Sequence, residues 1–513
     1  MARRYVLGVD SSTTSCKVIA WDHQGRAAAV GRAFYPTHSP RPGWYEQDAG
    51  LWWSSLCRAL GELFSRLSPS QVEAVCISNQ RETIVAVDSE GVPLREAILW
   101  LDERSREQLG YIHGTVGRER LHRLTGKPLS KVPSLPKLLW MAAVEPEIFS
   151  RTAKFLEAHA FLVHRLTGEY RTSLACADPV GLVDMSREQW SEELLQELGF
   201  RKDQFSQLVK PGEIIGRVTS SAATQTGLPQ GLPVVAGAGD GQCAGLGANV
   251  TGPETAYLIL GTGVIGGFFS SEYRIDPAYR TLYAPLADSY YLETVIKGGV
   301  FTVAWFAEKF AAELKKPWLS SSVEELLEQG ARGVPPGSDG LLLVPYWLSA
   351  MNPFWDPDAA GVMIGWSGAH GPEHFYRAIL EGVAFEQRFA LDEALRAGVE
   401  DFEEYRVVGG GSRSELWCQI VADISGRPAV TLSSAEATAL GAGMLAAVAV
   451  GWYPDCRKSA AAMSAPGMRY APDGERRRIY ERIFLEVYRS LFSTVRPLVD
   501  RLREITREGN SGA

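Results

Sequence analysis

A short pattern occurs twice in this 513-residue chain, once at the start of each half. Residues 5–22, YVLGVDSSTTSCKVIAWD, read as an apolar strand, a turn rich in serine and threonine, and a second strand. Residues 256–270, AYLILGTGVIGGFFS, repeat this plan around a Gly-Thr-Gly turn. Two domains of similar build with a ligand between them would produce such a repeat. Chance would also produce it, because short apolar hairpins are common.

Helical segments follow each of the two hairpins. Asp48 is a good N-cap for the amphipathic segment after it, and Pro372 opens a segment with apolar residues four apart. The alternation of strands and helices predicts an α/β fold, and the chain is too long for a single compact core. We therefore expect an N-terminal domain over residues 1–250 and a C-terminal domain over residues 251–513, joined near Ala248–Glu254.

The composition excludes several classes of protein. A formal net charge of −8 provides no basic surface for nucleic acid or for an anionic membrane. No stretch approaches the ~20 apolar residues that span a bilayer, and the N-terminus lacks the apolar core of a signal peptide. The seven cysteines form no Cys-x-x-Cys pair, which favours reduced thiols and a cytoplasmic location. His159 and His164 stand apart from other metal-ligating residues and are expected to serve in packing.

Three turns of small residues follow apolar strands. In GVDSSTTSCK, residues 8–17, Asp10 ends a strand and hydroxyl residues follow; such turns bind anions, and the carboxylate can hold Mg²⁺ through water. This is not a P-loop, because the glycine spacing and the Gly-Lys-Ser/Thr ending are absent. LGTGVIGG (residues 260–267) and VVGGGSRSE (residues 407–415) lack the Rossmann spacing. Each turn alone fits ordinary hairpin chemistry, whereas the set fits one nucleotide in a cleft.

Asp240 is the one charged residue in VVAGAGDGQCAGLG, residues 234–247. One interpretation is a Gly-Asp-Gly turn with positive φ. The other is a carboxylate that accepts a proton from a docked ligand, with glycines that let the ligand approach. A later segment, EATALGAGMLAAVAV from Glu436, has small residues on several faces, which indicates either close helix packing or a backbone wall beside an adenine.

An ordered set of segments resembles the FGGY carbohydrate kinases over nearly the whole chain. The segments are GVDSSTTSCKVIAWD, GWYEQDAGLWW, SNQRETIVAVDSEGVPLREAILWLDER, PKLLWMAAVEPEIF, VVAGAGDGQCAGLG, LGTG, GVMIGWSGAHGPEHFYRAILEGVAFEQR, GGGSRSELWCQIVADISGRP and EATALGAGMLAA. The resemblance implies an α/β fold of two actin-like (ribonuclease H-like) ATPase domains with a cleft between them. It implies that the first domain holds the sugar and the catalytic base, that the second holds the nucleotide, and that the cofactors are ATP and Mg²⁺.

The same resemblance gives roles to individual residues. Asp240 matches the base that takes the proton from the attacking sugar hydroxyl, and Asp10 matches the carboxylate that positions Mg²⁺. The positions that match nucleotide-binding residues are Thr13 and Thr14 in the first phosphate turn, Gly261 and Thr262 in the second, and Gly410, Gly411 and Ser414 in GGGSRS.

The acceptor site is expected around NQRET, residues 79–83, which is similar to glycerol kinases. Arg81 would donate to, and Glu82 would accept from, adjacent hydroxyls of a vicinal diol; an ordinary surface ion pair is the alternative. Further candidate substrate residues are Trp44, Trp100, Asp102, Gln242 and Asp240 itself. The two tryptophans would offer apolar faces to a carbohydrate, unless they are simply buried.

Two departures from glycerol kinases favour a longer acceptor. Val132 and Ile265 stand where glycerol kinases carry aromatic residues around their small substrate. GGGSRSELWCQIVADISG is similar to xylulokinases and gluconate kinases, although xylulokinases commonly have Met-His in place of Arg81-Glu82. We expect an ATP-dependent pentulose kinase, with D-xylulose as the favoured acceptor and glycerol or erythritol as the alternative.

A function of another class also fits these motifs. Actin-like folds serve as ATP-driven switches, scaffolds and sensors that phosphorylate no sugar, and a base beside a polyol-binding Arg-Glu pair argues against that use here. The expected partner is a small sugar or polyol, with no nucleic acid and no membrane, and a homodimer is left open.

Overall fold

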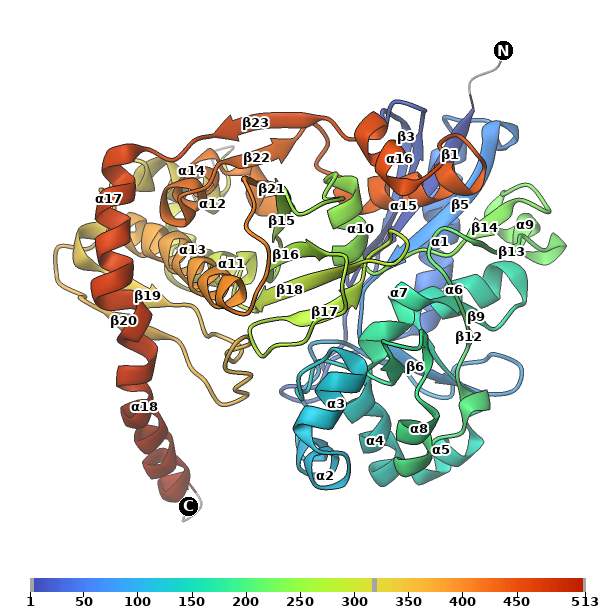
Figure 1. Ribbon diagram of the computed structural model, residues 1–513, viewed down its shortest axis with the longest axis horizontal. Helices are drawn as coiled ribbons and strands as arrows, with labels where there is room; N and C mark the ends of the chain where they lie inside the picture. The colour runs from blue at the N-terminus through green and yellow to red at the C-terminus, as the bar shows by residue number, and fades with distance from the viewer. Residues whose placement is uncertain (1–3, 316–320, 511–513) are drawn as a thin grey trace.

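Figure 1 shows the computed structural model, which describes residues 4–315 and 321–510 as two α/β halves around two large sheets. The first sheet has the order β13-β14-β5-β1-β2-β3. Its strands are β1 (Tyr5–Ser11), β2 (Ser15–Trp21), β3 (Ala27–Phe34), β5 (Val72–Asn79), β13 (Ile214–Arg217) and β14 (Pro233–Val235). Strand β1 is antiparallel to β2 and parallel to β5, which is parallel to β14.

The second sheet has the order β17-β18-β16-β15-β21-β22-β23. Its strands are β15 (Thr255–Leu260), β16 (Val264–Ser270), β17 (Arg280–Tyr283), β18 (Tyr290–Ile296), β21 (Glu404–Val408), β22 (Ala429–Leu432) and β23 (Pro466–Tyr470). Strand β15 is antiparallel to β16 and parallel to β21, as β1 is to β2 and β5. Both predicted hairpins are therefore confirmed, and each leads into the same topology.

Smaller sheets and many helices surround the first large sheet. The additional strands are β4 (Glu46–Gln47), β6 (Ile84–Val87), β7 (Ala97–Ile98), β8 (Lys154–Glu157), β9 (Arg171–Ser173), β10 (Val183–Asp184), β11 (Gln189–Trp190) and β12 (Gln207–Val209). The helices are α1 (Ala49–Phe64), α2 (Gln108–Thr115), α3 (Arg118–Thr125), α4 (Ser134–Val144), α5 (Pro146–Arg151), α6 (Ala158–Thr167), α7 (Leu174–Ala177), α8 (Glu192–Glu197), α9 (Ser220–Thr226) and α10 (Asp240–Gly247). Asp48 caps α1 as predicted, since its side chain accepts from the Gly50 amide.

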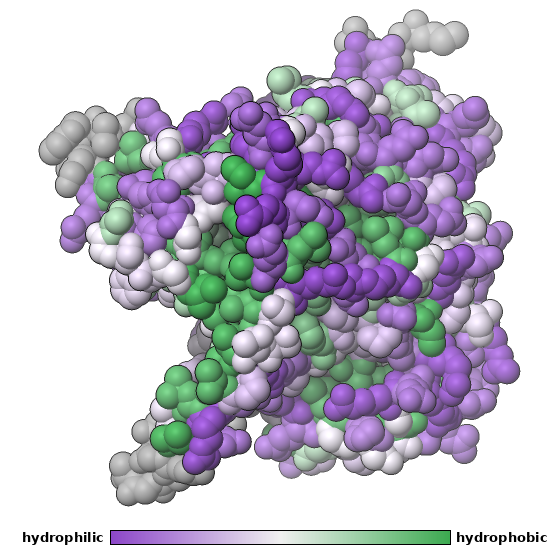
Figure 2. Space-filling model, turned by 60° about the vertical axis from the view of Figure 1, so that its left-hand side comes forward, coloured by the Kyte–Doolittle hydropathy of each residue, from purple (hydrophilic) through white to green (hydrophobic). Residues whose placement is uncertain are grey.

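The second half adds a short strand pair and a further set of helices. The strands are β19 (Leu342–Val344) and β20 (Val362–Ile364). The helices are α11 (Val300–Phe310), α12 (Val323–Ala331), α13 (Pro372–Arg396), α14 (Glu415–Ser425), α15 (Ala437–Ala449), α16 (Cys456–Met463), α17 (Gly474–Ile483) and α18 (Arg489–Asn510). Helix α13 starts at Pro372, as predicted. In Figure 2, α18 projects from the body, and its exposed apolar side chains include Leu498 and Leu502.

Helices α10 and α15, from different halves of the chain, pack against each other between the two large sheets (Figure 1). A Cβ on Gly441 would lie 2.0 Å from the carbonyl oxygen of Cys243, and one on Gly247 would lie 2.0 Å from that of Ala437. Glycine is thus required here because the two backbones approach so closely. Close packing accounts for the small residues of the Glu436 segment.

The structure corrects the turn interpretation of the Asp240 segment. Asp240 is the first residue of α10, and neither flanking glycine has a positive φ; that of Gly239 is −60°. All seven cysteines are free thiols. Within residues 4–315 and 321–510, no helix combines the length and apolarity needed to cross a membrane.

Candidate functional site

The candidate acceptor residues meet at the carboxyl ends of the parallel strands β1, β5 and β14. Asn79, which ends β5, forms a parallel bridge with Gly239, and the Gln80 amide donates to the Ser11 carbonyl at 2.8 Å. Ligands of open α/β sheets bind at this edge, because the loops that leave parallel strands converge there. The residues brought to this edge are Asp10, Arg81, Glu82 and Asp240.

Asp240 is held in place by Arg81. Oδ1 of Asp240 lies 2.9 Å from Nε of Arg81, and the aspartate side chain keeps 42% of its surface exposed. A Cβ on Gly239 would lie 2.4 Å from Cδ of Arg81, and one on Gly241 would lie 2.7 Å from its Nη2. The two glycines therefore make room for the side chain of Arg81, at its aliphatic part and at its guanidinium, rather than for a turn.

Arg81 and Glu82 belong to a buried ion network that joins the two halves. Nη1 of Arg81 donates to Oε2 of Glu293 at 2.8 Å, and Nη2 of Arg280 donates to the same oxygen at 2.9 Å. Arg280 also donates to Oε1 of Glu82 at 2.7 Å, and the Tyr257 hydroxyl donates to Oε1 of Glu293 at 2.6 Å. With Arg81 and Glu82 only 4% and 6% exposed, the alternative of a surface ion pair is wrong.

Glu293 and Arg280 are members of this network that the sequence interpretation missed. They lie on β18 and β17, in the half opposite the NQRET segment. Burial raises the pKa of Glu293, but Arg81 and Arg280 together outweigh it and hold that pKa below its usual value. The available signal was a single carboxylate inside the apolar strand YYLETVI.

The remaining candidate substrate residues fall into two groups. The Trp100 indole donates to Oγ1 of Thr13 at 3.1 Å, so this candidate substrate residue contacts the first phosphate turn directly. The other three are engaged elsewhere. The Arg104 guanidinium lies 3.9 Å from the Trp44 ring and donates to Asp102, and the Gln242 amide donates to the carbonyls of Ala175 and Tyr283.

The Gly-rich turns of the second half come together as expected for neighbouring parallel strands. Gly261 and Thr262 follow β15, and Gly410 and Gly411 follow β21 in a short 3₁₀ helix. Gly409 lets the two turns approach closely, because its φ is 89° and a Cβ there would lie 2.7 Å from the Leu260 carbonyl oxygen.

Ser414, the last of the candidate nucleotide residues, caps α14. Its hydroxyl accepts a hydrogen bond from the Trp417 amide at 3.0 Å.

Asp10 has the properties of a cation ligand. Its Oδ1 is buried and has no hydrogen-bond partner among the described residues. Burial and the neighbouring Asp240 carboxylate raise the pKa of Asp10 to about 7. An unpartnered carboxylate facing a second one suits Mg²⁺, a hard cation that keeps several waters. In the part of the chain that the structure describes, no cluster of three metal-ligating side chains occurs, so water and phosphate oxygens would complete the coordination.

Thr14 is the exposed member of the first phosphate turn, between β1 and β2. Lys17, at its far side, forms an ion pair with Glu436 in front of α15. The Thr438 hydroxyl lies 3.5 Å from the carbonyl oxygen of Asp240. The first phosphate turn, the Asp240 helix and α15 therefore border one region between the halves.

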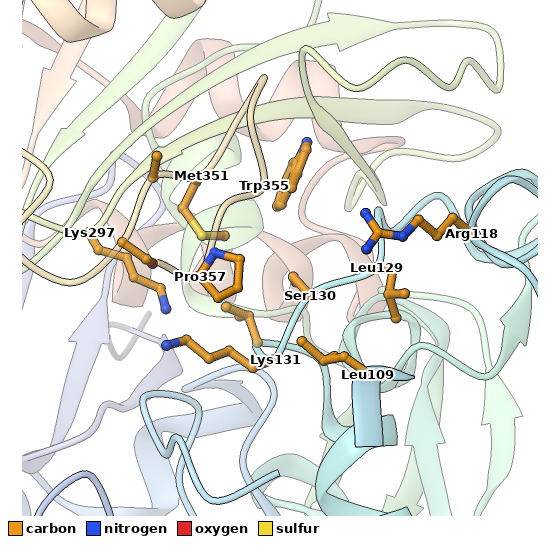
Figure 3. A pocket seen from close by; sticks show the side chains of 12 residues that line it. Leu109, Arg118, Leu129, Ser130, Lys131, Lys297, Met351, Trp355 and Pro357 are labelled. Atoms are coloured by element: carbon orange, nitrogen blue, oxygen red, sulfur yellow. The ribbon is translucent and has the colours of Figure 1, made fainter. Parts of the chain in front are cut away.

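A pocket of about 60 Å³ opens between the halves beside Val132, one of the two positions that favour a long acceptor (Figure 3). The loop that carries Val132 is fixed by Lys137 on α4. The ammonium group of Lys137 donates to the carbonyls of Lys131, Val132 and Pro133 at 3.2, 2.6 and 3.0 Å. Burial lowers the pKa of Lys137 to about 8.

Both halves of the chain match one family. Residues 5–247 match the N-terminal domain of the FGGY family of carbohydrate kinases, and residues 256–450 match the C-terminal domain. The chain belongs to the FGGY family of carbohydrate kinases. This FGGY kinase is 28% identical to the xylulose kinase of Bacillus subtilis, over 98% of this chain and 100% of that protein. It is 31% identical to the glycerol kinase of Nocardia farcinica, over 88% and 91% of the two chains.

The structural comparison agrees. The FGGY kinase superposes on the crystal structure of xylulose kinase from Rhodospirillum rubrum with a TM-score of 0.87 and 27% identity, over 97% of this chain and 100% of that one. The predicted fold of two actin-like domains is confirmed, and so is the expectation of a carbohydrate kinase. Kinases of this family use ATP as the phosphoryl donor.

Proposed function

We propose that this FGGY kinase transfers the γ-phosphate of ATP to a pentulose, with D-xylulose as the favoured acceptor and D-xylulose 5-phosphate as the product. The observation that supports it most is the half-exposed Asp240 carboxylate, held by the buried Arg81 next to Glu82. A switch that only hydrolyses ATP has no use for a base beside a buried donor–acceptor pair.

In this proposal Asp240 accepts the proton of the attacking hydroxyl. The acceptor oxygen forms a bond to the γ-phosphorus, the bond to the leaving ADP oxygen breaks, and the proton moves to the free oxygen of Asp240. Arg81 fixes the other oxygen at 2.9 Å, so the base is oriented before the acceptor arrives. Arg81 and Glu82 would bind adjacent acceptor hydroxyls, and Trp100 would cover the sugar.

The nucleotide would lie across the turns of both halves. The candidates for contacts with the phosphates are Thr13, Thr14, Gly261 and Thr262. The candidates for contacts with the rest of the nucleotide are Gly410, Gly411 and Ser414. Mg²⁺ held through Asp10 would supply positive charge to the phosphate oxygens.

The two domains would divide the substrates between them. The N-terminal domain, residues 1–250, would bind the sugar, and the C-terminal domain, residues 251–513, would bind the nucleotide. Closure of the two halves would exclude water, which otherwise competes as acceptor.

The acceptor is the finer part of the proposal. Val132 and Ile265 leave space where glycerol kinases carry aromatic residues, which supports a five-carbon acceptor. The xylulose kinases among the relatives support the same choice. Arg81 and Glu82 keep glycerol or erythritol as the second candidate acceptor.

The cytoplasmic location and the homodimer stay predictions. Cell fractionation would check the location, and sedimentation velocity would check the oligomeric state.

The test is a coupled ADP-release assay with Mg·ATP against D-xylulose, L-xylulose, D-ribulose, L-ribulose, glycerol and erythritol. Preference for D-xylulose supports the proposal. Preference for glycerol or erythritol means that the Arg81–Glu82 pair outweighs the missing aromatics. ADP release that no acceptor stimulates would contradict the proposal in favour of the switch.

A further inference from the structure

Helix α18 carries an apolar stripe that the described part of the chain covers only at one end. The stripe consists of Leu491, Val495, Leu498, Leu502 and Ile505. These residues follow one another at intervals of four and three, the spacing by which two helices pack along a shared seam. Leu491 is buried against the body, but the last three side chains of the stripe are 73%, 63% and 50% exposed. Within one subunit, most of the stripe therefore faces water.

Contacts near the start of α18 fix the direction of the helix. The Tyr488 hydroxyl, in the π-helical turn just before α18, donates to Oε2 of Glu386 on α13 at 2.8 Å. One and a half turns into the helix, Arg496 forms an ion pair with Asp356 of the body. Beyond this point α18 leads away from the body (Figures 1 and 2). Because the helix is held in this direction, it cannot fold back over its own stripe, and another molecule has to cover it.

The exposed apolar surface continues from α18 onto the body. The Phe354 ring packs against the Phe492 ring of α18, with 5.2 Å between the centroids, and Phe354 is 40% exposed. Figure 2 shows hydrophobic side chains gathered along the hollowed side between α18 and the body. Single exposed apolar side chains are ordinary in soluble proteins, whereas a contiguous apolar surface marks a site of interaction.

The charges beside the stripe favour a second copy of the same helix as the partner. Arg501, which adjoins the stripe one turn after Leu498, is paired with Glu504 of the same helix at 3.0 Å. Such an edge needs no opposite charge from a partner, so the apolar seam complements itself, as a two-fold symmetric contact requires. The net charge of −8 disfavours an anionic membrane as the alternative.

We propose that the stripe is a self-association surface, on which α18 of one subunit packs antiparallel against α18 of a second copy around a two-fold axis. The antiparallel arrangement places the free end of each helix beside the start of the other, where Phe354 is exposed. The residues of the candidate site all come from one chain, so this contact goes beyond the proposed function and does not depend on it.

Sedimentation velocity over a concentration series tests the proposal with Leu498→Glu. The wild-type enzyme should form a dimer, and the variant should raise the dissociation constant of that dimer about hundredfold or more, because a symmetric contact loses the buried leucine twice. The matched control is Met468→Glu on β23, which makes the same kind of change at a side chain that is 66% exposed. Circular dichroism should show that both variants are folded. A wild-type enzyme that stays monomeric, or equal effects of the two variants, would overturn the proposal.

Cross-linking identifies the surface itself. Near a two-fold axis a residue meets its own copy, so Leu498→Cys or Leu502→Cys should give a covalent dimer with a short bismaleimide. The wild-type enzyme, whose seven thiols are free, gives the background, and Met468→Cys is the control that should not exceed it. A dimer that persists in solution while neither α18 variant cross-links would show that another surface holds it, which contradicts the proposal.

A lipid surface is the other outcome that these variants can reveal. Flotation of the wild-type enzyme with vesicles of phosphatidylcholine and phosphatidylglycerol, lost in Leu498→Glu, would assign the stripe to a membrane and overturn self-association. None of these measurements requires an acceptor. Failure of every acceptor in the kinase assay therefore leaves the proposal standing, whereas a monomeric enzyme that phosphorylates D-xylulose overturns self-association alone.

Discussion

Asp240 keeps one oxygen bound to a buried guanidinium and the other available to a ligand. Asp240→Asn removes the basic oxygen and retains the shape of the side chain. We expect kcat to fall by about 10²–10⁴-fold, the usual contribution of a general base, while ATP binding is retained. The measurement is kcat from the coupled assay beside ATP affinity from calorimetry. Near-normal turnover would rule out Asp240 as the base.

Glu293 is shared by two arginines, so its charge positions both of them. Glu293→Gln removes that charge and leaves buried guanidinium groups incompletely paired. We expect the free energy of unfolding to fall by about 3–5 kcal/mol, as for a broken buried pair. The KM of the acceptor should rise much more than that of ATP, because Arg81 loses its fixed position. Equal effects on both substrates would show that Glu293 acts on stability only.

Lys297 predicts a pH-dependent stability whose sign can be worked out. In the unfolded chain a lysine has a pKa of about 10.4, whereas burial and Lys131 lower that of Lys297 in the folded protein to about 7. The buried charge therefore destabilises the folded state fully below pH 7, and this destabilisation disappears as the pH rises toward about 10. Lys297→Met should unfold at a higher temperature than wild type at pH 6.5, by a margin that shrinks by pH 9.5. Thermal unfolding at both pH values checks this, and a constant margin would mean that the charge plays no part.

At the scale of elements, the contact between α10 and α15 depends on glycines. Gly441→Ala places a methyl group 2.0 Å from a backbone carbonyl, which cannot move as a side chain could. We expect the free energy of unfolding to fall by about 1–3 kcal/mol or more. The matched control is Gly61→Ala on α1, where nothing beyond the neighbouring residues and backbone of the same helix lies within 4 Å of the new Cβ, and a gain of about 0.5–1 kcal/mol is expected. Urea unfolding compares the two, and similar values would contradict the packing account.

The elements that sequence could predict are those whose signals are local. The hairpins β1–β2 and β15–β16 follow from apolar runs around short turns, and Asp48 and Pro372 mark helix starts by their own chemistry. The start of α10 could not be predicted, because a glycine-rich segment has low helix propensity. Packing of α10 against α15, which lies almost two hundred residues further along the chain, overrides this low helix propensity.

The candidate site shows the same limit. The resemblance pointed to Arg81, Glu82 and Asp240, and the structure places them at one edge of the first sheet. Glu293 lies 212 residues from Arg81, so its role depends on a pairing that no local pattern reveals. The burial of Lys297 shows the same limit: a lysine after an apolar strand looks like a surface residue, yet in the fold it is only 7% exposed.

At the scale of the whole molecule, the shared network and the α10–α15 contact should make the two halves unfold together. We expect tryptophan fluorescence and circular dichroism to report one coincident transition. ATP at about 100 times its Kd should stabilise the protein by about 2.7 kcal/mol and shift that transition as a unit. Two separate transitions, with ATP moving only one, would show that the halves are independent.

The three carbonyl contacts of Lys137 have an evolutionary consequence. Because the loop at residues 131–133 is held through its backbone, its shape does not depend on which side chains it presents. Substitutions at Lys131 and Val132 can therefore change what the wall of the pocket recognises without rebuilding the loop. A library randomised at these two positions should yield folded enzymes with shifted acceptor preference, whereas one randomised at Lys137 should yield few folded proteins. Selectivity in this enzyme would then be able to drift quickly while its architecture stays constant.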